Sequence, residues 1–180
     1  MIKKIIISGF GGQGILFTGS LLCQAGINEG KHVTFFPSYG AEMRGGTANC
    51  QVIISDSPIG SPVVETPHIL LSFNKPSFLK FSKKLKNHGT ALVNSSLFKP
   101  RQIPKKIDIV KIPANKLAEQ CGSKLVMNVI MAGALIGKTK ILDFESILQA
   151  IPLLLTGKKT EFRKINKKAL LKGRDFLKKT

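Results

Sequence analysis

The stretch at residues 2–22, IKKIIISGFGGQGILFTGSLL, decides the fold. Its β-branched run over 2–8 predicts a buried strand, and the apolar spacing over 14–30 predicts a helix that ends at a glycine. The next apolar run, HVTFF at 32–36, predicts a second strand. A strand, a glycine loop, a helix and a second strand in this order are typical of the first unit of a doubly wound parallel sheet.

The rest of the chain continues this alternation before it becomes helical. The patterns predict four further strands, at 47–55, 68–73, 90–96 and 106–113. They predict five more helices, at 76–86, 114–121, 125–137, 144–155 and 160–178, the fourth with Asp143 as its N-cap. The proline-rich segment 56–67 cannot be helical and is expected to cross the surface or to form an edge hairpin. We therefore expect an α/β fold, a Rossmann-like, three-layer, mostly parallel sheet with C-terminal helices, in a single domain over residues 1–180.

The formal charge of +18 arises from 28 basic and only 10 acidic residues. Nucleic acid is the first partner that such a charge suggests, but 24 of the basic residues are lysines, and no helix-turn-helix or aromatic RNA-binding motif is visible. The charge is instead expected to steer an acidic partner protein or an anionic ligand towards the chain. Its densest part, 158–180, holds ten basic residues and is interpreted as the solvated face of a terminal helix.

Cysteine and histidine are too scattered to predict a metal site. The three cysteines include no C-x-x-C pair, and the three histidines lie far apart, so neither a metal ion nor an iron–sulfur cluster is expected in this chain. The longest apolar stretch, 125–137, carries Asn128 and is shorter than the ~18 residues that a membrane span requires. The first residues do not resemble a secretory leader, and a cytoplasmic protein is therefore expected.

The glycine loop after the first strand has the G-x-G-x-x-G spacing of a dinucleotide-binding turn. Its candidate binding residues are Gly9, Gly11, Gly12, Gln13 and Gly14. An NAD site also needs an acidic residue at the end of the second strand, and that strand ends in Phe-Phe-Pro-Ser instead. Two other interpretations stay open. The glycines only permit a tight turn, or the helix N-terminus forms an anion site into which Gln13 points a neutral amide.

A second polar loop, SYGAEMRGG at 38–46, follows the second strand. Its candidate residues are Ser38, Tyr39, Gly40, Glu42, Arg44, Gly45 and Gly46. The glycines allow backbone conformations and close approaches that other residues would not. If the segment is extended, Glu42 and Arg44 share one side, and either they pair with each other or Arg44 faces an anion. The pattern fits both a turn with a surface ion pair and a functional loop.

Taken together, GFGGQG at 9–14 and PSYGAEMRGGTANC at 37–50 make the sequence resemble the gamma subunit of 2-oxoacid:ferredoxin oxidoreductases. SDSPIGSPVV at 55–64 is similar to that family as well, and so, less specifically, are Asn128 and the last helix. The resemblance covers nearly the whole chain. The second loop is most like that of 2-oxoglutarate enzymes, with the branched-chain 2-oxoacid (2-oxoisovalerate) enzymes close behind.

The resemblance implies a subunit of a larger enzyme. That enzyme converts 2-oxoglutarate, coenzyme A and oxidised ferredoxin to succinyl-CoA, carbon dioxide and reduced ferredoxin. In the family, thiamine diphosphate and magnesium lie between the alpha and beta subunits, and the iron–sulfur clusters lie in other chains, which can include a ferredoxin-like delta subunit. The resemblance therefore assigns this chain a structural and gating role, with no catalytic residue and no cofactor bound by the chain alone.

On this interpretation both glycine loops lie at the carboxyl edge of the sheet and face the partner subunits, near the active-site entrance or the coenzyme A path. Replacing Arg44 by Ala is then expected to lower holoenzyme turnover or coenzyme A affinity while the chain stays folded. A small-residue surface at Ala132, Gly133 and Gly137 either packs on the sheet or forms a contact between two gamma chains. A stand-alone nucleotide-binding enzyme and a basic nucleic-acid-binding protein are the competing classes.

Overall fold

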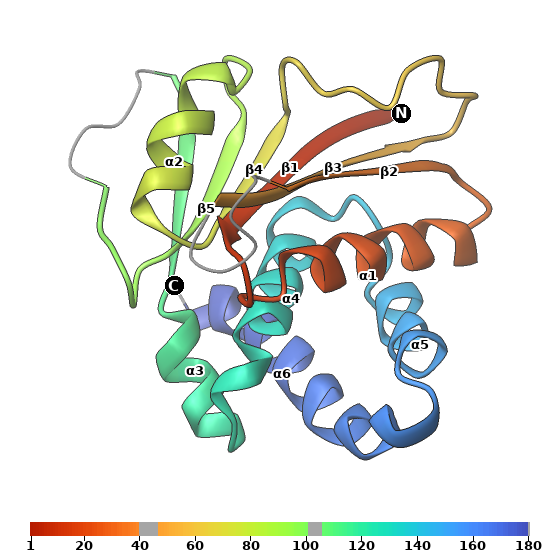
Figure 1. Ribbon diagram of the computed structural model, residues 1–180, viewed down its shortest axis with the longest axis vertical. Coiled ribbons are helices and arrows are strands. Elements are labelled where there is room, and N and C mark those ends of the chain that lie inside the picture. The colour runs from red at the N-terminus through yellow and green to blue at the C-terminus, as the bar shows by residue number, and fades with distance from the viewer. Residues whose placement is uncertain (40–46, 101–105, 180) are drawn as a thin grey trace.

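The computed structural model describes residues 1–39, 47–100 and 106–179. In this part of the chain, the strands come first with two α-helices among them, and four α-helices follow last (Figure 1). The strands are β1 (Ile2–Phe10), β2 (His32–Tyr39), β3 (Thr47–Ser55), β4 (Ile69–Ser72), β5 (Thr90–Asn94) and β6 (Asp108–Ile112). The α-helices are α1 (Ile15–Asn28), α2 (Lys75–Phe81), α3 (Ala114–Cys121), α4 (Met127–Thr139), α5 (Phe144–Leu154) and α6 (Arg163–Phe176). Short 3-10 turns are η1 (Ser82–Lys84), η2 (Lys124–Val126), η3 (Gly157–Phe162) and η4 (Leu177–Lys179).

These strands form one sheet in the order β2-β3-β1-β4-β5-β6. The strands β1, β4, β5 and β6 are parallel, as the alternating pattern predicts. Strand β3 is antiparallel to both of its neighbours and lies between β1 and β2. The prediction that residues 2–36 form the first unit of a parallel sheet is therefore corrected. β2 runs in the same direction as β1 but does not pair with it.

The composition of β2 and β3 explains why β3 takes the interior position. β3 buries residues on both of its faces, among them Cys50, Val52 and Ile53, and a strand that is apolar on both faces belongs in the interior of a sheet. β2 exposes 37% of Phe35 and 42% of Phe36. It also contains Pro37, which lacks a backbone donor and is tolerated at a sheet edge. The nonlocal pairing of β3 with β1 thus separates two strands that are neighbours in the sequence.

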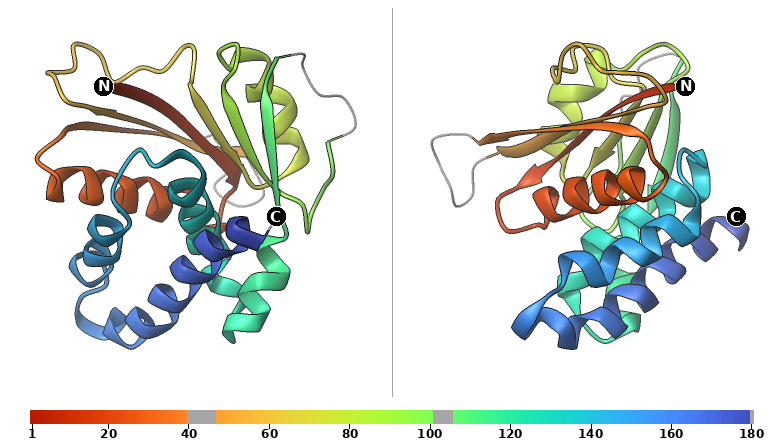
Figure 2. Two further views of the ribbon diagram at one scale, coloured as in Figure 1. Left: turned by 180° about the vertical axis from the view of Figure 1, so that it is seen from behind. Right: turned by 90° about the vertical axis from the view of Figure 1, so that its right-hand side faces the viewer.

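Helices cover both faces of the sheet, which confirms the predicted three-layer α/β architecture (Figure 2). On one face, α2 places Phe78 and Phe81 in a small core with Ile6 of β1 and Val93 of β5. The other face carries the larger core, which the strands share with α1 and α3–α6. Removal of apolar surface from water, at roughly 25 cal/mol per Å², is the main favourable term in assembling these layers.

The proline-rich segment between β3 and β4 crosses the surface without forming a helix or a strand, as predicted. Val64 inserts into the small core, and its backbone N–H donates a hydrogen bond to the side-chain oxygen of Gln51. The segment thereby helps α2 to cover this face of the sheet.

The predicted helices form with altered ends. The helix predicted over 76–86 is α2 followed by the η1 turn, and α4 and α6 are each preceded by a 3-10 turn. Asp143 stands at the N-cap of α5, but its side chain makes no capping hydrogen bond. Its backbone N–H instead donates to Glu29 Oε1 at 2.7 Å, which ties the start of α5 to the end of α1.

Helix α4 is buried along most of its length and packs tightly against α6. A Cβ atom at Gly133 would overlap the carbonyl oxygen of Leu170, and one at Gly173 would overlap the carbonyl oxygen of Ile130. The two backbones approach this closely because no side chain separates them at these points. The glycine surface of α4 is therefore occupied by α6 of the same chain, not by the sheet, and it is not free for a second gamma chain.

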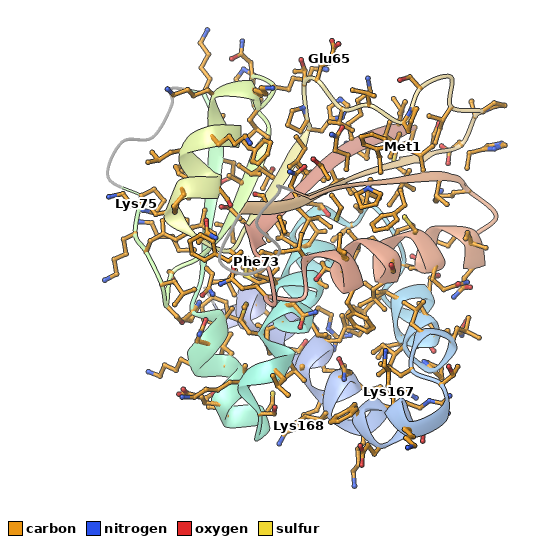
Figure 3. The ribbon with its side chains drawn as sticks, in the orientation of Figure 1. Met1, Glu65, Phe73, Lys75, Lys167 and Lys168 are labelled. Carbon is orange, nitrogen blue, oxygen red and sulfur yellow. The ribbon has the colours of Figure 1, made fainter. Side chains whose placement is uncertain are left out.

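The outer face of α6 is basic and solvated, as the charge pattern predicts. Lys164, Lys167 and Lys168 are exposed, while Ala169 and Leu170 on the inner face are buried (Figure 3). None of the helices in the described part of the chain is both long and apolar enough to cross a membrane.

The close approach of α4 and α6 predicts a large effect for a small change. Gly133→Ala and Gly173→Ala should each lower the free energy of unfolding by about 1–3 kcal/mol, because the added methyl group meets backbone that cannot rotate away. Gly60→Ala is the matched control, since nothing lies within 4 Å of its Cβ position. Thermal and urea unfolding would measure all three variants. Equal stability of Gly173→Ala and Gly60→Ala would contradict the tight packing.

Candidate functional site

The glycine loop joins β1 to α1 and is closed by its own glutamine. Gln13 Oε1 accepts a hydrogen bond from the backbone N–H of Phe10 at 2.7 Å, and the backbone N–H of Gln13 donates to the Phe10 carbonyl at 3.2 Å. The Gln13 carbonyl group is therefore used inside the loop. One interpretation of the sequence predicts that Gln13 points its amide into a ligand site. For the amide oxygen this is wrong, because the oxygen accepts a hydrogen bond within the turn and stabilises it.

The glycines of the loop are required for different reasons. Gly14 has a left-handed φ of +75°, and a Cβ there would lie 2.5 Å from Asn128 Nδ2. A Cβ at Gly9 would lie within 3 Å of Gln13, Ile15 and Phe73. These two positions support the interpretation of a tight turn. Gly12 also has a positive φ, of +88°, but nothing lies within 4 Å of its Cβ position.

Gly11 and Gly12 form the exposed tip of the loop. The open space around Gly12 is not explained by packing within the chain. Behind this tip, α1 begins at Ile15 with unpaired backbone N–H groups and no acidic residue in its first turn. The tip is thus a place where backbone can approach a ligand or a partner closely.

Asn128 connects the loop to the C-terminal helices. Its Nδ2 atom donates to the carbonyl oxygen of Gly14 at 3.3 Å across 114 residues of sequence. The same oxygen accepts from the Thr18 hydroxyl at 2.9 Å and from the Thr18 backbone N–H at 3.0 Å. Asn128 is a buried residue, so little water competes for this polar contact. The position of the loop is therefore fixed by α4 as well as by β1.

The two loops predicted as sites start from the same edge of the sheet. Phe10 at the end of β1 pairs with Thr47, and Tyr39 at the end of β2 pairs with Ala48. Ser38 of the second loop lies on β2 in register with Asn49. The remaining predicted residues of that loop, Gly40, Glu42, Arg44, Gly45 and Gly46, lie outside the described residues.

A row of polar residues crosses the sheet at this edge. Ser38, Asn49, Ser8 and Ser72 follow one another in register across β2, β3, β1 and β4. Ile6 belongs to the core beneath α2, and side chains alternate along a strand, so Ser8 lies on the same face. The row therefore lies on the α2 face, at the carboxyl end of β1.

Buried polar atoms without a hydrogen-bond partner gather beside this row. Ser8 Oγ, Asn74 Nδ2 and Ser77 Oγ are three of the four such side-chain atoms in the part of the chain that the structure describes. Asn74 caps α2 by accepting from the Ser77 backbone N–H at 2.9 Å, which leaves its amide nitrogen without a partner. An unsatisfied buried polar group costs about 1–3 kcal/mol, and native proteins concentrate such groups where a ligand or water completes them.

Ser38 is the one member of the row that was predicted from the sequence, and Ser8, Ser72, Asn74 and Ser77 were not. Phe73 sits between them at the end of β4, where its backbone N–H donates to the Ser8 carbonyl at 2.9 Å, and it lies near the start of α1 (Figure 3). The available signal was a polar residue placed directly after a buried apolar run, as in IIIS and ILLSFN. Asn94 follows the same rule at the end of β5, but its amide is satisfied by Asn115 Oδ1 at 2.7 Å.

The described residues contain no metal-ligand group, no reactive thiol and no acidic ribose anchor at the end of β2. No group of three or more histidine, cysteine or acidic side chains lies together there, so no metal-ligand set is found in this part of the chain. Burial raises the pKa of Cys23 and of Cys50 to about 12, so neither thiol is a nucleophile near neutral pH. β2 ends without an acidic residue, which removes the ribose anchor of an NAD site.

Fold and site together define a Rossmann-like module that presents a glycine loop at the carboxyl edge of its sheet. The chain belongs to the pyruvate ferredoxin/flavodoxin oxidoreductase family, whose model matches residues 4–176. It is 37% identical over 180 residues to ketoisovalerate oxidoreductase subunit VorA of Methanothermobacter marburgensis. The matched residues make up 98% of this chain and 37% of VorA. It is also 37% identical over 154 residues to 2-oxoglutarate synthase subunit KorC of Methanocaldococcus jannaschii, which covers 84% of this chain and 82% of KorC.

Solved structures share the fold over almost the whole chain. The keto/oxoacid ferredoxin oxidoreductase gamma subunit of Geobacter sulfurreducens matches with a TM-score of 0.84 and 29% identity, over 97% of this chain and 95% of that one. The 2-oxoglutarate:ferredoxin oxidoreductase of Magnetococcus marinus, with 2-oxoglutarate, coenzyme A and succinyl-CoA bound, matches with a TM-score of 0.90 and 24% identity, over 99% of this chain and 31% of that one. The resemblance to gamma subunits drawn from the two loops is confirmed. The chain spans little more than a third of the length of VorA.

The contact between Asn128 and Gly14 can be tested with one pair of variants. Asn128→Asp removes the donor and turns a carboxylate towards a carbonyl oxygen, so it should lower the free energy of unfolding by about 1–3 kcal/mol. Asn115→Asp is the matched control, because Asn115 acts as an acceptor and an aspartate keeps that role. Urea unfolding compares the two. Stability of Asn128→Asp equal to that of Asn115→Asp would contradict the assignment of Asn128 as a donor to the loop.

Proposed function

We propose that this chain is the gamma subunit of a 2-oxoacid:ferredoxin oxidoreductase whose substrate is 2-oxoglutarate. The complex would convert 2-oxoglutarate, coenzyme A and oxidised ferredoxin to succinyl-CoA, carbon dioxide and reduced ferredoxin. The observation that carries the proposal is the exposed glycine tip at Gly11 and Gly12, on a chain that belongs to a family of oxidoreductases. The described residues of this chain hold no metal-ligand group. Such a chain would contribute a binding surface, and the reacting groups would come from its partners.

The substrate assignment rests on the second loop. PSYGAEMRGGTANC at 37–50 resembles the form found in 2-oxoglutarate enzymes. The equal identity to KorC and to VorA keeps a branched-chain 2-oxoacid, 2-oxoisovalerate, as the alternative substrate. A stand-alone nucleotide-binding protein is disfavoured, because β2 ends without the acid that would bind a ribose.

The cofactors of the complex would be held mainly by other chains. The described residues do not fit thiamine diphosphate with magnesium or an iron–sulfur cluster, since no metal-ligand group occurs among them and their three cysteines are buried. Alpha and beta subunits, with a ferredoxin-like delta subunit in some members, are the partners that the family implies, and ferredoxin is the electron acceptor. The carboxyl edge is the surface that we expect them to cover.

Coenzyme A is the ligand that this edge would fit. Coenzyme A accepts the acyl group in the overall reaction. It is also bound in the solved structure of the Magnetococcus marinus enzyme, which shares the fold of this chain. The unpaired N–H groups at the start of α1 are suited to phosphate oxygens. The chain would thus orient the carrier without touching the reacting carbon.

The function as a whole can be tested by purification from the native host without oxygen. A tagged chain should bring down a brown complex that contains thiamine diphosphate and reduces ferredoxin with 2-oxoglutarate and coenzyme A. Activity with 2-oxoisovalerate and none with 2-oxoglutarate would select the alternative substrate. A colourless chain that purifies alone and binds NAD would overturn the proposal.

The role of the glycine tip can be tested with one substitution at two equivalent positions. Gly12→Asn adds a side chain in open space at a left-handed residue, which asparagine tolerates, so the chain should remain folded. The added group should lower holoenzyme turnover or coenzyme A affinity by about tenfold or more, because the backbone can no longer be approached. Gly30→Asn has the same kind of backbone, with a φ of +69° and open space, at the other end of α1. Steady-state kinetics of the two holoenzymes decide the matter, and equal kinetics would contradict the role of the tip.

A further inference from the structure

A polar pocket lies at the opposite edge of the sheet from the glycine loop. It has a volume of about 330 Å³ and opens at the amino ends of β1, β4 and β5 and at the last turn of α4. Among the residues that line it are Lys3, His68, Lys86, Gly89, Thr90 and Lys138. Nothing in the function proposed above uses this pocket.

The backbone around the pocket is held by a closed set of hydrogen bonds. The Lys86 N–H donates to the Pro67 carbonyl at 2.9 Å, and the Thr90 N–H donates to the His68 carbonyl at 3.0 Å. Gly89 sits so close to this frame that a Cβ would lie 2.7 Å from the Lys86 oxygen and 2.9 Å from the His68 oxygen. The turn is therefore fixed in shape.

His88 follows the same frame in a strained conformation. Its φ of +63° is rare for a residue with a side chain, and its backbone N–H is held by the Lys106 carbonyl at 2.6 Å. Strain of this kind persists where the surroundings fix it, and it is concentrated at functional sites.

His68, which lines the pocket, has a fixed tautomer. Its Nδ1 atom accepts a hydrogen bond from the backbone N–H of Lys4 at 3.0 Å, so the imidazole proton resides on Nε2. Burial lowers the pKa of His68, and the nearby charges of Lys86, Lys3 and Lys4 lower it further. The side chain is therefore a neutral donor at physiological pH, since a second proton on Nδ1 would break the bond to Lys4.

The charges that face the pocket are mainly positive. Lys138 is paired with Asp108, with Nζ and Oδ2 2.8 Å apart. Lys3 and Lys86 have no acidic partner among the residues that the structure describes. The carboxyl end of α4 at Thr139 adds a partial negative charge, which is smaller than two full lysine charges. The ammonium groups of Lys3 and Lys86, the imidazole N–H of His68 and the hydroxyl of Thr90 are all hydrogen-bond donors. The pocket therefore offers more donors than acceptors to a ligand.

We propose that this pocket binds a phosphate group, either as the free ion or as the phosphate of a small ester. Lys3 and Lys86 supply the charge, His68 Nε2–H and the Thr90 hydroxyl supply directed donors, and the rigid turn at Gly89 supplies the shape. The site is separate from the carboxyl edge, because the two lie at opposite ends of the same strands. The proposal of a phosphate site therefore does not depend on the proposed gamma-subunit role.

The test is a titration of the full chain with inorganic phosphate, followed by nuclear magnetic resonance at constant ionic strength set with chloride. Saturable shifts are expected for the His68 imidazole and for the amides of residues 86–90, with one phosphate bound per chain. Lys86→Gln should weaken binding about five- to tenfold, because one charged donor is lost at a partly solvated site. Lys167→Gln, on the exposed face of α6, removes the same charge elsewhere and should change the affinity less than twofold.

A parallel titration with glycerol phosphate distinguishes the two sources of the group. Tighter binding of the ester assigns the pocket to a phosphorylated metabolite, and equal or weaker binding assigns it to the free ion. Shifts that grow linearly with phosphate, or equal loss of affinity in Lys86→Gln and Lys167→Gln, would overturn the proposal, because the response would then reflect net charge alone.

Discussion

The carbonyl oxygen of Gly14 is the point on which the arrangement of the functional edge depends. It accepts hydrogen bonds from the Thr18 backbone, the Thr18 hydroxyl and the Asn128 amide, so the glycine loop, α1 and α4 meet at one atom. Asn128 can reach it only because residue 14 lacks a side chain. α4 is in turn held against α6 where Gly133 and Gly173 remove any spacer between the helices. A continuous line of close contacts therefore runs from the glycine loop to the last helix, and it makes the C-terminal helices part of the support of the loop.

This construction explains why the loop is rigid but its tip is open. Neighbouring side chains occupy the space where a Cβ atom would lie at Gly9 and at Gly14. The hydrogen bond from Phe10 to Gln13 fixes the backbone between them. Gly12 projects into free space with a conformation that few residues adopt. A fixed tip of bare backbone is suited to contact with a partner or a carrier molecule, and it performs no proton transfer or nucleophilic attack by itself. The partnerless side chains of Ser8 and Asn74 lie at the same end of the sheet, but they are buried and do not reach the surface.

Local patterns predicted most of the elements and both loops, and nonlocal pairing accounts for what they missed. The run IKKIIIS and the spacing after it specify β1 and α1 through residues that are neighbours in the chain. The insertion of β3 beside β1 depends on a pairing register between residues that lie 37 to 53 positions apart, which periodicity does not encode. The glycines of α4 were interpreted as a contact with the sheet or with a second chain, because their true neighbour α6 follows some forty residues later. Ser8 directly follows an apolar run, Asn74 and Ser77 lie a few residues after the next one, and no local pattern marks the three as a group.

Hydrogen–deuterium exchange of this chain, free and assembled with the alpha and beta subunits proposed above, tests most directly whether the carboxyl edge faces other subunits. Assembly should slow exchange at the amides of residues 10–16 and 72–78, because partner subunits would cover the tip of the loop and the start of α2. Exchange at residues 86–90, at the opposite edge, should remain unchanged. Unaltered exchange at residues 10–16, or protection confined to residues 86–90, would contradict the assignment of the glycine loop as the surface through which this chain serves its enzyme.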